Sequence, residues 1–332
     1  MRATLLKETL KAKMAANIKR SSVVVGPPGG GKTSIIKQVA KELDYQYIQR
    51  HLPTMPVEDL GVPMVDKPML YYKLPEWFPA KGSKHDTGTP GILCFDDRNQ
   101  AGTDLQKALA NLVQERELHG IPMADNWHIV STGNRQQDRA GANRILSHLS
   151  DRENEVELET HLDDWTAWAM ENGVRTEVIS FIRFKSGLLH DFDPQRDKNP
   201  TPRSWCEGVS PVIDVVPKEA EFPEFKGAVG EGPASEFVGF LRIFRKLPNP
   251  DAVLLNPLSA EVPTDPATLY ALSGSLAQRA SNSNFERVCQ YVERMPPEFS
   301  VLTVSMALRR EKALSNTAAF GNWVVKHHDV MF

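Results

Sequence analysis

The chain has 332 residues, enough for about two domains of ordinary size. Its 39 basic and 42 acidic side chains give a formal net charge of −3, which excludes a strongly basic nucleic-acid binder of the histone type. Hydrophobic residues make up 41% of the sequence, so a sizeable core can form and wholesale disorder is excluded. The three cysteines follow no disulfide or metal-binding pattern, so we expect a reducing, cytoplasmic setting. No apolar run approaches the ~20 residues that a membrane span needs.

Residues 1–20 predict an amphipathic helix. One helical face can hold Leu5, Leu6, Thr9, Leu10 and Met14, and basic residues interrupt every apolar stretch. A signal peptide would need a continuous apolar stretch followed by a cleavage site. A transit peptide is the alternative, but a strand begins directly after this segment.

From residue 20 to about 160, short apolar runs alternate with segments of helical periodicity. Strands are predicted at 21–25, 89–95 and 127–133, with helical stripes between them. This alternation predicts an α/β fold with a parallel sheet between helices. We expect that core to occupy 1–160, although its acidic end at 151–164 is predicted to be a solvated face and linker.

The rest of the chain is predicted to be mostly helical. Helices are predicted at 161–172, 175–189, 203–210, 234–246, 266–280, 284–294 and 303–325. Proline-rich joints separate them. We expect an all-helical lid at 161–246 and a helical C-terminal extension at 247–332.

A glycine-rich run between a predicted strand and a predicted helix fits the P-loop pattern G-x-x-x-x-G-K-[ST] in full. The run GPPGGGKT occupies 26–33. Backbone N–H groups of such a loop curl around phosphates at a helix N-terminus, where the dipole favours negative charge. We expect Lys32 to reach the β- and γ-phosphates of ATP and Thr33 to hold Mg²⁺. The predicted nucleotide-binding residues are Gly26, Pro27, Pro28, Gly29, Gly30, Gly31, Lys32, Thr33 and Ser34.

Polar side chains end the other two predicted strands. Asp96 follows a buried strand beside the phosphate loop, which is the Walker B arrangement that holds Mg²⁺ through water. Asp97 is placed to orient or deprotonate the attacking water. Asn134 ends the third strand, and its amide can position that water or contact the γ-phosphate. The alternative is ordinary turn chemistry, in which aspartate and asparagine cap surface loops.

These three elements, in this order and spacing, resemble an AAA+ ATPase of the MoxR branch, of bacterial or phage type. The family's run D-E-I-N-R-A after the Walker B strand corresponds to DDRNQA at 96–101. MPVEDLGVP at 55–63 resembles its P-x-D-L-x-G run, and STGNRQQ at 131–137 resembles its sensor-1 strand end A-T-x-N-P. The resemblance covers about residues 5–245.

The resemblance implies roles for three further side chains. Asn134 takes the sensor-1 role. Arg152 matches the arginine of the D-R-F run that closes the next helix, where the family carries its arginine finger. PRSW at 202–205 matches the P-R at the head of a lid helix, so Arg203 takes the sensor-2 role.

Two departures from the family pattern affect these assignments. Asp97 stands where the family has glutamate, so its carboxylate is one methylene shorter, and a non-hydrolysing nucleotide switch is an alternative function. Glu153 stands where the family has phenylalanine after the arginine. Arg144 lies one or two helical turns before Arg152 and competes for the finger role.

The resemblance also implies how the protein works. A finger supplied to a neighbouring subunit requires a homo-oligomeric ring, which is a hexamer in the family. MoxR proteins remodel or assemble a protein partner and commonly work with a von Willebrand factor A domain protein. The expected location is the cytoplasm, which is that of the host if the chain is phage-encoded.

Two rival functions use the same phosphate loop. A nucleic-acid motor or loader shares the ATPase core, but the near-neutral composition speaks against it. A monomeric kinase of a small molecule needs an acceptor pocket and no arginine in trans. Tyr71, Tyr72, Trp77 and Phe78 lie in an insertion before the Walker B strand, where they either grip a polypeptide, stack on bases or pack on the domain.

Overall fold

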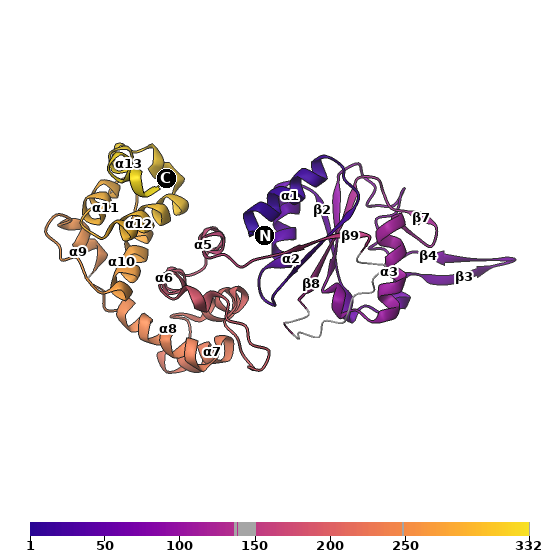
Figure 1. Ribbon diagram of the computed structural model, residues 1–332, viewed down its shortest axis with the longest axis horizontal. Coiled ribbons are helices and arrows are strands. Elements are labelled where there is room, and N and C mark those ends of the chain that lie inside the picture. The colour runs from indigo at the N-terminus through magenta and orange to yellow at the C-terminus, as the bar shows by residue number, and fades with distance from the viewer. Residues whose placement is uncertain (136–137, 139–150, 248, 332) are drawn as a thin grey trace. The chain divides into compact units, whose positions relative to one another are not determined.

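The computed structural model describes residues 1–135, 138, 151–247 and 249–331 (Figure 1). Contacts within the chain divide it into two compact units, Met1–His161 and Leu162–Phe332. Within the described residues, no helix has both the length and the apolar character needed to cross a membrane.

The described part of the first unit is built on a parallel sheet in the strand order β2-β5-β8-β1-β9. The strands are β1 Ser21–Gly26, β2 Gln46–His51, β5 Gly91–Asp96, β8 Trp127–Asn134 and β9 Glu153–Glu157. The strands predicted from the apolar runs are therefore confirmed as β1, β5 and β8, and the α/β fold is confirmed with them. These three central strands are buried almost throughout, which explains why they are apolar on both faces.

The edge strand β9 differs from the prediction. The acidic run 151–164 is predicted to be a solvated face and linker. The linker part is wrong for Glu153–Glu157, which pairs in parallel with β1, although Asn154, Glu155 and Glu157 are exposed as predicted. Its sequence ENEVE has low strand propensity, so pairing with the buried β1 rather than local preference makes it a strand. Glu153 lies opposite Ser21 in this ladder and is buried.

Helices cover both faces of the sheet. Figure 1 shows α1 (Ala3–Ala15) and α2 (Lys32–Glu42) on one side and α3 (Thr103–Glu115) on the other. Of its predicted apolar face, the N-terminal helix buries Leu6, Leu10 and Met14, whereas Thr9 is half-buried and Leu5 is 53% exposed. The amphipathic helix predicted there is thus confirmed.

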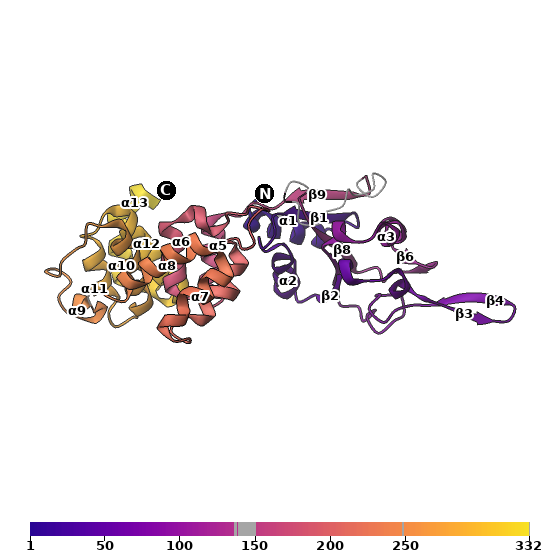
Figure 2. The same ribbon diagram turned by 90° about the horizontal axis from the view of Figure 1, so that it is seen from below.

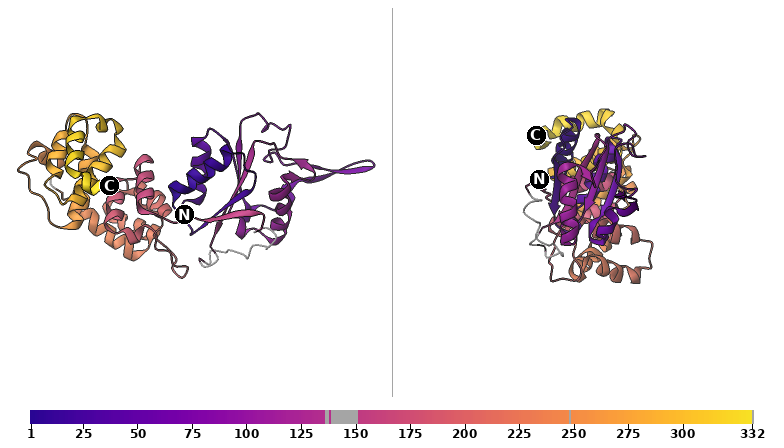
Figure 3. Two further views of the ribbon diagram at one scale, coloured as in Figure 1. Left: turned by 45° about the horizontal axis from the view of Figure 1, so that its top comes forward. Right: turned by 90° about the vertical axis from the view of Figure 1, so that its right-hand side faces the viewer.

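A hairpin projects from this unit, as Figures 2 and 3 show. It pairs β3 (Val62–Asp66) with β4 (Met69–Lys73) in antiparallel register. Its large apolar side chains are exposed: Val62, Met64, Val65, Met69, Leu70, Tyr71 and Tyr72. At its base, the ring of Tyr72 stacks on His119, with the ring centroids 3.8 Å apart. His119 lies in the turn between β6 (Glu117–Leu118) and β7 (Ile121–Pro122).

The four aromatic residues of the insertion divide into two pairs. Phe78 is buried, and Trp77 packs edge-on against Phe95 of β5 with ring centroids 6.3 Å apart. The packing interpretation therefore holds for this pair. It does not hold for Tyr71, whose side chain is exposed on the hairpin, and it holds in part for Tyr72, which is exposed but stacks on His119.

The second unit is helical. Its α-helices within the described residues are α5 Leu162–Glu171, α6 Thr176–Phe184, α7 Lys218–Val229, α8 Glu231–Phe244, α9 Pro250–Leu255, α10 Pro266–Arg279, α11 Phe285–Val292, α12 Pro297–Arg310 and α13 Ala318–Met331. The helix predicted at 303–325 is in fact two, because a 3₁₀ turn at Lys312–Asn316 separates α12 from α13. The prediction missed α7, which contains Pro223 in its interior.

One aromatic cluster organises the core of this unit. Phe181 lies against Trp205, Phe237 and Phe240, with ring centroids 5.1 to 5.5 Å apart. The same core continues into the C-terminal helices through buried residues such as Leu276. The expected lid and extension therefore share one core, and their division at residue 246 stays a prediction.

Candidate nucleotide-binding site

The phosphate loop joins the buried strand β1 to the first turn of α2. Gly31 precedes α2 with a φ of 90°, which is in the left-handed region that favours glycine. Gly30 is also confined, because a Cβ there would lie 3.2 Å from the carbonyl oxygen of Pro27. These two glycines let the chain turn sharply enough for α2 to begin at Lys32, with its N-terminal N–H groups at the loop.

Lys32 is buried at 7% exposure, and its ammonium group is held by the loop itself. Its Nζ donates to the carbonyl oxygens of Gly26 and Pro27, each at 3.0 Å. It also donates to Oδ1 of Asn134 at 2.8 Å. The lysine is therefore directed at the ends of β1 and β8, and the phosphates of a nucleotide would compete with these oxygens for it.

Asp96 accepts hydrogen bonds from three side chains, two on neighbouring strands and one in the first turn of α2. Its Oδ1 accepts from Oγ1 of Thr33 at 2.5 Å and from Oγ1 of Thr132 at 2.6 Å. Its Oδ2 accepts from Nε2 of Gln49 at 2.9 Å. Hydroxyl and carboxylate oxygens are the ligands that Mg²⁺ prefers, so the donor set at Thr33 and Asp96 fits this ion.

Asp97 has a left-handed backbone, with a φ of 52° and a ψ of 43°. Such a conformation is uncommon for a residue other than glycine and is often found at functional sites. Its N–H donates to Oγ1 of Thr132 at 3.0 Å, which supports the turn. Its Oδ1 accepts from Nδ2 of Asn134 at 3.4 Å. The carboxylate that was expected to act on water thus lies beside the expected sensor.

Asn99, in the 3₁₀ turn Arg98–Gln100, makes two hydrogen bonds to the backbone of Asn134. Its Nδ2 donates to the carbonyl oxygen of Asn134 at 2.5 Å, and its Oδ1 accepts from the N–H of Asn134 at 3.1 Å. The space is tight, because a Cβ at Gly133 would lie 3.2 Å from Oδ1 of Asn99. Asn99 therefore fixes the end of β8 relative to the Asp96–Asp97 turn.

Sequence reasoning missed Gln49, His51, Thr132 and Asn99 as members of this site. The signal was present, since polar residues near the carboxyl ends of neighbouring parallel strands meet at one edge of a sheet. His51 lies opposite Asp96 in the ladder between β2 and β5. Its Nδ1 is 3.9 Å from Oδ2 of both Asp96 and Asp97, so the three side chains can together hold a metal ion.

The structure does not bring Arg152 to the phosphate loop of its own subunit. Arg152 lies next to Glu153, which pairs with Ser21 at the opposite end of β1, and its Nη1 donates to the carbonyl oxygen of Ala110 in α3 at 3.4 Å. Arg203 belongs to the second unit, where its exposed side chain precedes the π-helical turn Ser204–Val209. Its role stays a prediction. The rival arginine, Arg144, lies outside the described residues.

Together these features define a P-loop nucleoside triphosphatase. A glycine loop lies between a buried strand and a helix; its threonine bonds to the carboxylate of Asp96 and its lysine to the amide of Asn134, at the ends of two parallel strands. Residues 21–152 match the family described as "AAA domain (dynein-related subfamily)", so this part of the chain is an AAA domain. The match supports ATP binding and ATP hydrolysis by a P-loop enzyme.

Comparison with solved structures gives only distant likenesses. The chain is 11% identical to Brucella abortus NtrX in complex with ADP, with a TM-score of 0.41 over 98% of this chain and 67% of that one. A Cytophaga hutchinsonii protein assigned as an ATPase is 15% identical, with a TM-score of 0.35 over 98% of this chain and 88% of that one. Among curated protein sequences no match was found.

Proposed function

We propose that the protein is a MoxR-like AAA+ ATPase that works as a homo-oligomeric ring, hexameric by resemblance, and that remodels or assembles a protein partner. The observation that carries the proposal is the separation of Arg152 from the phosphate loop of its own subunit. Arg152 directly precedes β9, whose first residue Glu153 lies opposite Ser21 at the start of β1. The phosphate loop begins at Gly26, at the other end of β1. Five residues of strand span roughly 17 Å. Arg152 therefore cannot act on its own nucleotide, and a ring brings it to a neighbour's.

The roles within one subunit follow from the contacts at the loop. Lys32 exchanges its carbonyl and amide partners for the β- and γ-phosphates of ATP. Thr33 and Asp96 would hold Mg²⁺, which would supply positive charge that stabilises the phosphates. Asp97, beside Asn134, orients the attacking water and accepts its proton.

Two arginines complete the proposed mechanism. Arg152 of one subunit stabilises the charge that develops on the phosphates held by the next, for which a permanently charged, forked guanidinium is well suited. Arg203 acts as sensor 2 by neutralising phosphate charge from the helical unit. The assignment of Arg203 rests on the resemblance of 202–205 to the head of a lid helix.

The exposed hairpin favours a protein partner over a nucleic acid. Contiguous exposed apolar surface on a protein commonly marks an interaction site. Here it includes Val65 and Met69, which are 77% and 70% exposed, and aromatic Tyr71. Binding to nucleic acid would instead require a basic surface that follows the phosphates. A protein with a von Willebrand factor A domain is the partner class that the resemblance suggests.

The test of the ring mechanism mixes two inactive variants. Arg152→Ala keeps its nucleotide site but offers no finger, whereas Lys32→Ala keeps the finger but loses the nucleotide. In a mixed ring, the intact site of the first meets the intact arginine of the second, so ATPase activity should return. No recovery, in mixtures shown by light scattering to co-assemble, would count against an arginine acting in trans. Arg144→Ala in place of Arg152→Ala shows which arginine has the role.

Two further measurements separate the proposal from its rivals. ATPase activity that rises with added DNA or RNA, and falls back with salt, would indicate a nucleic-acid motor. ADP formed only when a small-molecule acceptor is present would indicate a kinase. The ring proposal expects neither, and it expects ADP and phosphate from ATP and Mg²⁺ alone.

A further inference from the structure

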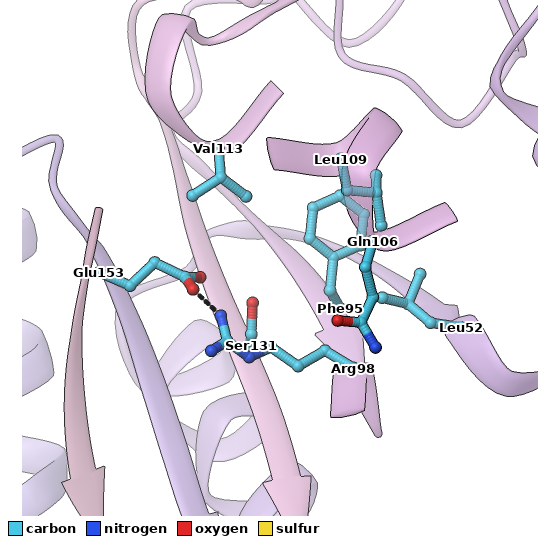
Figure 4. A pocket seen from close by; sticks show the side chains of 8 residues that line it. All are labelled: Leu52, Phe95, Arg98, Gln106, Leu109, Val113, Ser131 and Glu153. Atoms are coloured by element: carbon cyan, nitrogen blue, oxygen red, sulfur yellow. Dashed lines mark ion pairs between the residues drawn. The ribbon is translucent and has the colours of Figure 1, made fainter. Parts of the chain in front are cut away.

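A buried ion pair joins the turn after Asp97 to the strand after Arg152. Nη1 of Arg98 pairs with Oε2 of Glu153, the first residue of β9 (Figure 4). The two side chains are 9% and 1% exposed. Burial lowers the pKa of Arg98 to about 10, against the opposing effect of nearby Glu155, so the guanidinium stays charged at neutral pH.

The pair borders a small cavity with other polar walls. The cavity measures about 20 Å³, and Gln106 and Ser131 also line it (Figure 4). Apart from the ion pair, Nε of Arg98, Oε1 of Gln106 and both carboxylate oxygens of Glu153 have no hydrogen-bond partner among the described residues. One water needs about 10–15 Å³ and two to four polar partners. The cavity, whose other walls are Leu52, Phe95, Leu109 and Val113, is therefore large enough for one water that these polar atoms could bind.

Both members of the pair replace apolar residues of the family pattern. The third position of the run D-E-I-N-R-A carries isoleucine, and here it is Arg98. The run D-R-F ends in phenylalanine, and here that position is Glu153. The two departures lie 55 positions apart in the sequence (153 − 98) and are each other's partners in the structure. They are therefore one structural feature.

Stability does not explain why the chain carries this pair. Removing two charges from water is costly, and replacing a buried ion pair by apolar side chains of similar volume often leaves a protein equally or more stable. An ion pair differs from an apolar contact in that it fixes direction as well as distance. This ion pair fixes the position of Arg98 relative to Glu153. Arg98 directly follows Asp97, and Glu153 directly follows Arg152.

The pair also extends a continuous set of contacts from the phosphate loop. Lys32 contacts Asn134, whose backbone is held by Asn99. Asn99 and Arg98 belong to the same 3₁₀ turn, Arg98–Gln100. A shift of the Lys32 side chain on ATP binding would therefore be passed through Asn134 and Asn99 to the turn Arg98–Gln100, whose Arg98 pairs with Glu153. Such contiguous networks are a physical means of coupling two sites.

We propose that Arg98 and Glu153 are positioning residues that couple a subunit's own nucleotide site to the arginine that it offers to its neighbour. The proposal rests on the proposed role of Arg152. Glu153 holds the start of β9, and with it Arg152, in a position set by the turn that follows Asp97. Hydrolysis in one subunit then responds to the nucleotide state of the next.

The test isolates the arginine that one subunit donates. The recipient carries Arg152→Ala and so depends on its neighbour's finger. The donor carries Asp97→Asn, which should bind ATP without hydrolysing it. We compare a donor that keeps the ion pair with one that also carries Arg98→Met and Glu153→Leu. Both donors have an inactive nucleotide site, so the ATPase activity measured comes from the recipient. A difference in activity between the two mixtures therefore reports how well each donor positions its Arg152.

We expect the donor without the ion pair to restore about 2- to 30-fold less activity, the range found for residues that couple distant sites. Its melting temperature, ATP affinity and co-assembly should match those of the first donor. If the Met and Leu variant does not fold, Arg98→Ile with Glu153→Phe, the family's residues, replaces it. Equal restoration by both donors would overturn the coupling alone. No restoration by either donor would overturn the coupling together with the ring mechanism on which it rests.

Discussion

Nζ of Lys32 donates a hydrogen bond of 2.8 Å to Oδ1 of Asn134, which joins the phosphate loop to the end of β8. The two residues lie 102 positions apart in the sequence. The contact places the lysine of the phosphate loop beside the proposed sensor, at the ends of the neighbouring strands β1 and β8. A nucleotide bound at this loop would therefore lie within reach of both side chains.

Lys32→Ala should remove most ATP binding, because the buried ammonium directed at the loop is lost. We expect the Kd for ATP to rise at least about tenfold, which corresponds to ~1.4 kcal/mol. Isothermal titration calorimetry measures this directly. Lys37→Ala, which changes an exposed lysine of the same helix, is the matched control and should leave the Kd unchanged. A Kd for Lys32→Ala within about a factor of two of wild type would mean that the loop does not bind phosphate.

Asp97→Asn should keep ATP binding and slow hydrolysis. The amide preserves the size of the side chain but cannot accept a proton, and groups of this kind contribute roughly 10²–10⁴-fold to rate. Phosphate release under saturating ATP gives kcat, and calorimetry gives the affinity. If wild type hydrolyses ATP no faster than Asp97→Asn, the non-hydrolysing switch replaces the motor.

The arrangement at the phosphate loop could largely be predicted from the sequence. Thr33, Asp96 and Asn134 each end or begin an element with a strong apolar pattern, and the parallel sheet brings those ends together. Their chemical roles remain predictions. The supporting hydrogen bonds from Gln49 and Thr132 were missed because a polar residue inside a strand gives no signal of its partner.

The rest of the first unit could not be predicted, since it depends on contacts between distant segments. The sequence ENEVE has no strand pattern, and β9 forms because the edge of β1 accepts it. Arg98 and Glu153 each look like surface charges, and only the fold makes them a buried pair. In the second unit, α7 was not predicted because proline usually interrupts a helix, and this helix contains Pro223 in its interior.

Replacing exposed apolar side chains of the hairpin should weaken capture of a polypeptide and leave basal ATP hydrolysis unchanged. Met69→Ser with Tyr71→Ser removes two exposed side chains of β4 and leaves the stacked base at Tyr72 in place. Casein, an unstructured polypeptide, serves as the probe in a pull-down and in ATPase stimulation. Val325→Ser, an exposed apolar residue of the second unit, is the control. Capture that is equal in all three proteins would remove the hairpin from the proposed function.

Stability should fall in mild acid because of His128. Burial, with the charges of Lys19 and Arg116, lowers the pKa of His128 to about 4 from 6.5. Between these values the unfolded chain binds a proton that the folded chain does not, so the stabilising contribution is complete above pH 6.5 and is lost as the pH falls towards 4. The free energy of unfolding should therefore drop by up to about 1.4 kcal/mol per pH unit in this window. Urea unfolding at pH 7 and pH 5 measures the drop, which His128→Gln should reduce and His161→Gln, at a partly exposed histidine, should not. An identical pH dependence in wild type and His128→Gln would show that another group carries the effect.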